Sequence, residues 1–377
     1  MWQCRQAPTR GDPRQPRRQL VAARVHRDGA VPPAPSPTIA DDVSTGFAVA
    51  AFLVALAATL GSSELLVLGL SRLGLKLGLA AGLLGLLTAL GADAPEFASA
   101  TSAALTGARE AGIGVILGSN LFNLAALLGV PGLLAGRLSF SRLVPLVDGT
   151  ANLLITLVAA GLLLGVLPGR VAVALFLVIL AGYVALLALP PRRVRRLPLP
   201  GWAVRIMVVP AAQIHSEDMV VDVIGAGAGW LPVWLVPAAV AVIVAGSVVM
   251  VTTALLLGRR WGVSDVVVGT VALAALTGVP NLYAAVRLAM RGDGATVVSE
   301  AFNSNTLNLV VGLGLPVVVL GPRADEHGVA ATLAWLGLTT VAAIAISAAQ
   351  RGLTRAGGAA MVLLYVGFLA MLLRGPH

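Results

Sequence analysis

Apolar runs long enough to cross a lipid bilayer dominate this sequence from residue 46 onward. A membrane-spanning helix takes ~20 apolar residues, and each such run must be helical because the hydrocarbon offers no water to backbone groups. The charged fraction of 11% agrees, since a soluble domain carries roughly 25% charged residues. The sequence therefore predicts an all-α polytopic membrane protein. Its ten expected spans lie near 46–70, 77–106, 111–135, 143–166, 168–190, 233–258, 262–290, 296–321, 328–350 and 356–374.

The polar segments divide the chain into four parts. Residues 1–45 are rich in Arg and Pro, and we expect a disordered basic tail without the apolar stretch of a signal peptide. Residues 46–190 and 233–377 hold five spans each, and the basic connection 191–232 separates them. Arginines gather in the connections on the side of 191–232, so the positive-inside rule predicts a cytoplasmic central loop and outside termini in a cell membrane. The +9 net charge is therefore attributed to the orientation of the chain in the membrane, and no nucleic-acid partner is expected.

The two groups of five spans match each other. Setting Pro95 on Pro280, an offset of 185 residues, aligns the halves without a gap from Gly61 and Gly246 to Pro131 and Pro316. Because five spans per half is an odd number, the second copy must be inverted. Inverted repeats are typical of secondary transporters, whose substrate site lies where the repeats meet. The matched pairs include Ser62 and Ser247, Gly107 and Gly292, Ser119 and Ser304, Asn120 and Asn305, Asn123 and Asn308, and Gly129 and Gly314.

A proline interrupts one span of each half. Pro95 lies in GADAPEFASATS and cannot donate a hydrogen bond to the carbonyl of Gly91. Pro280, in LTGVPNLYAA, does the same to Leu276. We therefore expect two broken spans with free carbonyl groups, which in transporters coordinate cations.

Two acids, Asp93 and Glu96, flank Pro95. An intramembrane carboxylate costs roughly 2.5–3.5 kcal/mol on insertion scales, so this pair needs a cation, a proton or a water-filled cavity. Lys76 and Arg109 are the nearest bases in sequence, and both lie near span ends. The pair therefore favours an ion site over a structural role.

The span that follows each proline carries a polar stripe. Ser119 and Asn123 are four residues apart and share a helix face, and Ser304 and Asn308 repeat this arrangement. Glu300 lies one turn before Ser304 on the same stripe. Such residues can also serve as interhelical hydrogen-bond partners, but their mirrored positions favour ligands.

These oxygens suit a hard cation. Ca²⁺ takes 6–8 oxygen ligands, and no soft ligand accompanies them, since Cys4 is the single cysteine. We expect transported cations, Ca²⁺ with H⁺ or Na⁺, and no cofactor. The predicted metal-site residues are Asp93, Glu96, Ser119, Asn123, Thr277, Asn281, Ser304, Asn308 and Glu300.

Other polar residues are weaker candidates. Glu64 and Asp148 also lie within predicted spans, near their ends. An acidic group in the central loop reads as a solvated loop rather than a regulatory cation site. It consists of His215, Glu217, Asp218 and Asp222.

GADAPE followed by GSNLFN, repeated as LTGVPN and NSNTLN, resembles the two alpha repeats of the cation/calcium exchanger superfamily, in a divergent prokaryotic form. In that family the first element usually reads G-T-S-L-P-E and the second G-S-N-I-F. The resemblance covers both halves and implies a sodium/calcium exchanger fold and a Ca²⁺ extruder driven by Na⁺ or H⁺ through alternating access. It also implies ligand positions at Glu96, Ser119, Asn123, Thr277, Ser304 and Asn308.

The chain departs from the family pattern around both prolines. Where the family has Thr-Ser, this chain has Ala92 and Asp93 in the first repeat and Thr277 and Gly278 in the second. The second-repeat Glu is Asn281. One carboxylate is lost and another appears on the opposite repeat, so Asp93 is expected to substitute for the missing acid.

The sequence supports three hypotheses. The first is a monomeric cation antiporter in the lipid bilayer, exchanging Ca²⁺ or a related cation for H⁺ or Na⁺. The close like charges of Asp93 and Glu96, the nearby Glu300 and the lost hydroxyls favour H⁺ over Na⁺. The alternative is a degenerate exchanger homologue acting as a non-transporting scaffold or sensor. A membrane enzyme is the third and weakest, because no nucleophile–base pair is visible.

Overall fold

The computed structural model describes residues 43–79, 81–188, 194–196, 198, 200–213, 234–320, 329–350 and 352–374. Residues Ser44–His377 form one compact unit, and all of the described helices and strands belong to it. Most of the predicted basic tail and the whole acidic group of the central loop lie outside the described residues.

The described elements are almost all helices. The first half contains α2 (Thr45–Lys76), α3 (Ala81–Ala92), α4 (Ala94–Leu105), α5 (Arg109–Asn123), the π-helix η2 (Leu124–Gly129), α6 (Val130–Ala135), the strand β1 (Arg137–Ser139), α7 (Leu143–Leu163) and α8 (Gly169–Ala188). Between the halves lies α10 (Gly201–Gln213). The second half contains α12 (Leu235–Arg260), α13 (Asp265–Val267), η3 (Val268–Leu273), α14 (Ala274–Met290), α15 (Gly294–Leu307), η4 (Asn308–Leu313), α16 (Gly314–Leu320), α17 (Val329–Ala349), β2 (Gly352–Thr354) and α18 (Arg355–Arg374).

The helices confirm the predicted polytopic fold. Within the described residues, nine helices are long and apolar enough to cross a membrane. The one remaining predicted span of the ten, 77–106, is divided into α3 and α4, of 12 residues each, with Asp93 between them. Pro95 stands in the first turn of α4, where its missing N–H is tolerated.

The duplication is visible in the backbone. Gly107 and Gly292, which the sequence alignment pairs, turn the chain with φ of 91° and 84° after α4 and α14. Such positive φ values favour glycine because it has no Cβ. The π-helices η2 and η4 also begin at matching places. η2 begins directly after Asn123, and η4 begins at Asn308, with which Asn123 is paired. The two halves therefore share turns and helix irregularities as well as sequence.

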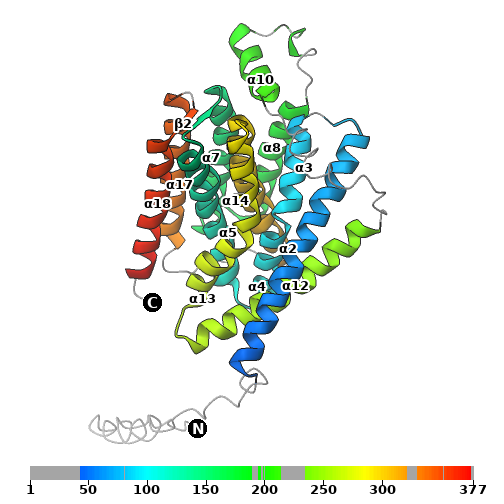
Figure 1. The fold of residues 1–377 in the computed structure, drawn as a ribbon, viewed down its shortest axis with the longest axis vertical. Helices are drawn as coiled ribbons and strands as arrows, with labels where there is room; N and C mark the ends of the chain where they lie inside the picture. The colour runs from blue at the N-terminus through cyan, green and yellow to red at the C-terminus, as the bar shows by residue number, and fades with distance from the viewer. Residues whose placement is uncertain are drawn as a thin grey trace, which may run out of the picture. The chain divides into compact units, whose positions relative to one another are not determined.

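The central helices are those that carry the polar stripes. In the α5–α6 and α15–α16 spans, 83% and 72% of the most apolar window is buried, against 22% for α8 and for α18. The long helices α2 and α12 pack along each other at one side of the molecule (Figure 1). The polar residues of α5 and α15 are therefore held in the protein interior.

Glycine allows the two repeats to approach closely at α5. A Cβ added to Gly118 would collide with the backbone carbonyl of Thr270 in η3, and one added to Gly269 would collide with that of Ala111. Here helix backbones of opposite repeats are in direct contact, as small residues permit in membranes.

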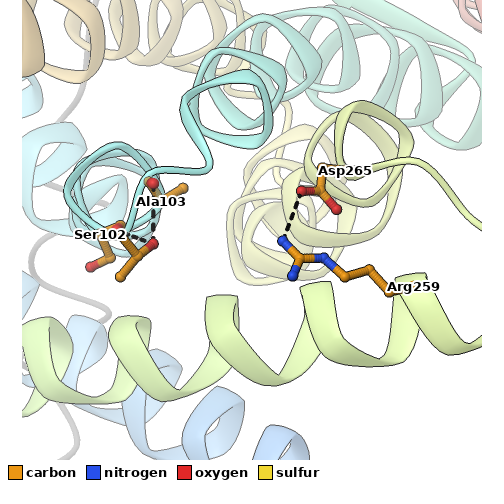
Figure 2. Close-up of polar contacts among 5 residues, drawn as sticks. Ser102, Ala103, Arg259 and Asp265 are labelled. Atoms are coloured by element: carbon orange, nitrogen blue, oxygen red, sulfur yellow. Dashed lines mark hydrogen bonds and ion pairs between the residues drawn. The ribbon is translucent and has the colours of Figure 1, made fainter. Parts of the chain in front are cut away.

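Polar contacts fix two helix ends (Figure 2). The Thr106 hydroxyl donates to the carbonyls of Ser102 and Ala103, 2.9 and 3.1 Å away, and so covers the end of α4. Arg259 pairs with Asp265 at 3.4 Å across the turn from α12 to α13. Since these contacts lie at helix ends, they define turns rather than the interior.

A short sheet joins two connections that are far apart in sequence. β1 pairs with β2 in antiparallel register, with Arg137 opposite Thr354. The sheet and α10 lie at one end of the helix bundle, whereas α2 begins and α18 ends at the other (Figure 1). The connections after the third and ninth spans therefore share one side, as the arginine pattern predicts.

Candidate cation site

Four of the predicted ligands are joined by hydrogen bonds where the α3–α4 junction meets α5, α14 and α15. These elements pack against one another across the two repeats. Asp93 stands at the junction and Glu96 in the first turn of α4, while Ser119 and Asn123 come from α5. The exposed fraction of every predicted ligand except Glu300 is 7% or less, and it is 0% for Asp93 and Glu96.

Asp93 is hydrogen-bonded to the opposite repeat. Asn281 Nδ2 and Ser304 Oγ both donate to Asp93 Oδ1, at 2.8 and 2.9 Å. Asn123 Nδ2 donates in turn to Ser304 Oγ at 2.8 Å. Asn281 stands where the resemblance places the family's second glutamate, and it lies within a hydrogen bond of the carboxylate of Asp93.

Several oxygens of the site have no hydrogen-bond partner within the described residues. In native structures most buried polar atoms are paired, so unpaired oxygens on neighbouring helices are available to bind a ligand. The repeat symmetry places Ser119 one turn from Asn123 and Asn308 one turn from Ser304. The unpaired buried oxygens are Asp93 Oδ2, Glu96 Oε1 and Oε2, Ser119 Oγ, Asn123 Oδ1 and Asn308 Oδ1.

This oxygen set fits a hard cation. Ca²⁺ takes 6–8 oxygens, from carboxylate, amide, hydroxyl and water, and the cluster offers six unpaired ones. Neither acid forms an ion pair within the described residues, and they are close enough to repel each other electrostatically. No group of three His, Cys, Asp or Glu side chains converges in the described part of the chain. A cation here would thus be held by two carboxyl groups and several neutral oxygens.

Two expectations about the prolines were wrong. The Gly91 carbonyl is not free, because the Ser63 hydroxyl of α2 donates to it at 2.9 Å and to the Ala92 carbonyl at 3.2 Å. Pro280 does not break its span but lies inside the continuous helix α14. The predicted pair of mirrored breaks is therefore a single break, in the first repeat.

Two predicted ligands differ in setting from the rest. The Thr277 hydroxyl donates to the Leu273 carbonyl of its own helix at 2.8 Å, so it can offer a cation only its lone pairs. Glu300 is half-buried rather than buried and forms no hydrogen bond within the described residues. It lies one turn before Ser304, at the margin of the cluster, close enough to Asp93 to be repelled by its charge.

Sequence reasoning missed Ser63 and undervalued Asn305. Ser63 lies 28 residues before Gly91 in another span, and no motif links the two. Asn305 Nδ2 donates to the Asn120 carbonyl at 3.0 Å and so ties α15 to α5. The alignment pairs Asn305 with Asn120, so the repeat itself held the signal for this contact.

Comparisons with known proteins identify the family of the chain. A family model described as sodium/calcium exchanger protein matches residues 47–190 and 231–374. The chain is 24% identical to “Putative antiporter CaxA” of Alkalimonas amylolytica over 329 residues, which cover 85% of this chain and 97% of that protein.

Two solved exchangers have a similar fold. The H⁺/Ca²⁺ exchanger CAX superposes with a TM-score of 0.65 at 14% identity, covering 88% of this chain and 82% of that one. The sodium-calcium exchanger NCX_Mj, soaked with Na⁺ and Sr²⁺, gives 0.56 at 19% identity, covering 87% and 99%. Both likenesses extend over the two five-helix halves.

Proposed function

The chain belongs to the sodium/calcium exchanger protein family, and we propose that it is a secondary active antiporter that exchanges Ca²⁺ or a related cation for H⁺ or Na⁺. The observation that carries the proposal is the cluster of six buried, unpaired oxygens, three of them from the carboxyl groups of Asp93 and Glu96. Each intramembrane carboxylate costs roughly 2.5–3.5 kcal/mol. A scaffold protein gains nothing from a pair of such groups without a counter-ion.

The site is divided between the repeats in a way that suits alternating access. The first repeat supplies both carboxyl groups, and the second supplies Asn281 and Ser304 as donors to Asp93. A bound cation would compete with these two donors for the Asp93 oxygens. Cation entry and release would therefore change the contacts that hold the repeats together, which is the coupling an antiporter needs.

We propose H⁺ rather than Na⁺ as the exchanged ion. Asp93 and Glu96 repel each other in a low-dielectric setting, and a proton on either relieves that repulsion. Glu300, half-buried at the margin of the cluster, is placed to pass protons toward it. The hydroxyls that the resembled family carries before its first proline are replaced here by Ala92 and Asp93, which leaves fewer neutral oxygens for Na⁺.

We also propose the orientation and state of the protein. The sheet of β1 and β2 puts Arg137 and Arg355 on the same side as α10. By the positive-inside rule that side is cytoplasmic, so the 191–232 loop faces the cytoplasm in a cell-membrane protein. Both ion-site halves come from one chain, and a monomer is therefore sufficient.

A non-transporting scaffold or sensor is the second candidate, and Asn281 favours it. With Asn281 in place of an acid, the second repeat contributes no carboxylate to the oxygen cluster. Such a protein could bind a cation without releasing it across the membrane.

Tracer flux in proteoliposomes separates the two functions. Purified protein is reconstituted, loaded with unlabelled Ca²⁺ and exposed to ⁴⁵Ca²⁺ under imposed Na⁺ or pH gradients. An antiporter shows uptake stimulated by Ca²⁺ on the opposite side, and a scaffold shows none. Binding without stimulated uptake under either gradient would overturn the antiporter proposal.

A further inference from the structure

A third buried carboxyl, that of Asp148 on α7, lies outside the cation site. The Asp148 side chain is 1% exposed. The Tyr183 hydroxyl oxygen of α8 lies 2.8 Å from Asp148 Oδ1 and 2.7 Å from Asn303 Oδ1 of α15. Asn303 Nδ2 donates to Ser299 Oγ at 3.3 Å. Three helices thus meet at one small polar network.

If Asp148 is ionised, this network has one hydrogen too few for its two short oxygen–oxygen contacts. Tyr183 has a single hydroxyl hydrogen, whereas an ionised carboxylate and an amide oxygen are both acceptors. Both short contacts of Tyr183 can be hydrogen bonds only if one of its two neighbours donates. A proton on Asp148 Oδ1 would donate to the Tyr183 oxygen, and the Tyr183 hydrogen would go to Asn303 Oδ1. Every short contact is then satisfied.

The other carboxyl oxygen supports the same proton. Asp148 Oδ2 is buried and has no hydrogen-bond partner within the described residues. In an ionised carboxylate this oxygen would carry part of a charge into a membrane-spanning interior, whereas in a neutral carboxyl it is an uncharged carbonyl oxygen that costs much less to bury. Rotating the Asn303 amide would supply a donor to Tyr183 but would leave this oxygen charged and unpaired.

The surrounding elements offer no compensating charge among their described residues. Of the ionisable side chains on the helices packed against α7, only Tyr183 is hydrogen-bonded to Asp148. Arg170 of α8 and Arg205 of α10 are exposed, and Arg170 is 13 residues, or about 20 Å of helix, from Tyr183. Glu300 of α15 would add repulsion, and α17 and η4 carry no ionisable residue.

We propose that Asp148 is a second proton-binding site, distinct from the cation site. Its network is linked to that site through α15, because Asn303 is followed directly by Ser304, the donor to Asp93. A second contact ties the same helices, with Asn152 Nδ2 donating to Thr306 Oγ1 at 3.4 Å. Protonation of Asp148 therefore holds α15 against α7 and α8, and loss of the proton releases it.

Infrared spectroscopy tests the proton directly and does not depend on transport. A carboxylic acid has a C=O stretching band that a carboxylate lacks. The wild-type spectrum at neutral pH minus that of Asp148→Asn should contain this band, and Tyr183→Phe should shift it because the hydrogen-bond partner is lost. Asp265→Asn is the matched control, since Asp265 pairs with Arg259 and should contribute no such band.

The opposite results are equally clear. A wild-type minus Asp148→Asn spectrum without a carboxylic acid band would show an ionised Asp148 and overturn the proposal. If Asp148→Asn did not fold, an unshifted carboxylic acid spectrum in Tyr183→Phe would do the same. In proteoliposomes, the role given to α15 rests on the proposed antiport. There the exchange rate of the wild-type protein should decline at alkaline pH, where Asp148 loses its proton. Asp148→Asn should exchange without this decline, because asparagine keeps a donor at every pH.

Discussion

The strongest test of the cation site moves its second carboxylate from one repeat to the other. Asp93→Ser removes the acid and introduces the side chain that the resembled family has there. A unit charge about 4 Å from a monovalent cation contributes about 4 kcal/mol at an effective dielectric constant of about 20. With tenfold in affinity for every 1.4 kcal/mol, cation affinity should fall about a thousandfold, and more for a divalent ion.

Adding Asn281→Glu should recover part of this loss. Asn281 Nδ2 lies 2.8 Å from Asp93 Oδ1, so the new carboxylate returns the charge to within a hydrogen bond of its former place. Recovery should be incomplete because Ser304 loses the oxygen to which it donates. We expect the double variant to bind at least about tenfold more tightly than Asp93→Ser, or about 1.4 kcal/mol.

Calorimetric Ca²⁺ binding and ⁴⁵Ca²⁺ uptake measure the two effects. The matched control is Asp93→Ser with Tyr283→Glu, which adds the same charge to α14 at a side chain that is 65% exposed. This control should recover nothing. A double variant no better than Asp93→Ser, or a control that recovers equally, would refute the shared position of the two carboxylates.

Three further predictions concern the same helices. Glu96→Gln should abolish uptake in a folded protein because the negative charge and one of two unpaired carboxylate oxygens are lost, whereas Glu110→Gln, at an exposed acid, should leave uptake intact; normal flux in the first variant would remove Glu96 from the site. Uptake should follow a pH gradient in sodium-free vesicles and slow in Glu300→Gln; uptake that needs Na⁺ and ignores pH would contradict proton coupling. Gly118→Ala, whose Cβ meets backbone, should cost about 1–3 kcal/mol and lower the melting temperature, whereas Gly182→Ala meets nothing within 4 Å and should not.

Sequence alone predicted the spans and the duplication because both depend on long-range regularities. An apolar run of ~20 residues has few alternatives in a bilayer, and a gapless offset aligns turn glycines such as Gly107 and Gly292. Helix continuity was harder to predict. Pro280 is tolerated inside α14 because membrane helices absorb proline through local π-helical turns and hydroxyl bonds. The preceding η3 and the bond from Thr277 to Leu273 are adjustments of this kind.

The sequence suggested residues for the candidate site but not the contacts among them. The exchange of carboxylate between Asp93 and Asn281 could be read from two aligned motifs, but their hydrogen bond joins residues 188 positions apart. The network of Asp148 gave less warning, since Tyr183 is 35 residues away and Asn303 belongs to the other repeat. Sequence periodicity assigns a residue to a helix face, whereas the identity of the neighbouring face follows only from packing.

The position of α15 connects the buried carboxyl groups of Asp93 and Asp148. Consecutive residues on an α-helix point about 100° apart because a turn takes 3.6 residues, and so Asn303 and Ser304 reach different neighbours. One contacts Tyr183 beside Asp148, and the other donates to Asp93. If cation binding displaces Ser304, α15 moves and the Asp148 network is disturbed. Thermodynamic linkage then requires reciprocity: the factor by which the cation changes proton affinity at Asp148 equals the factor by which that proton changes cation affinity. A helix with one ligand on each of two faces is thus sufficient to couple a proton to a cation without a shared binding site.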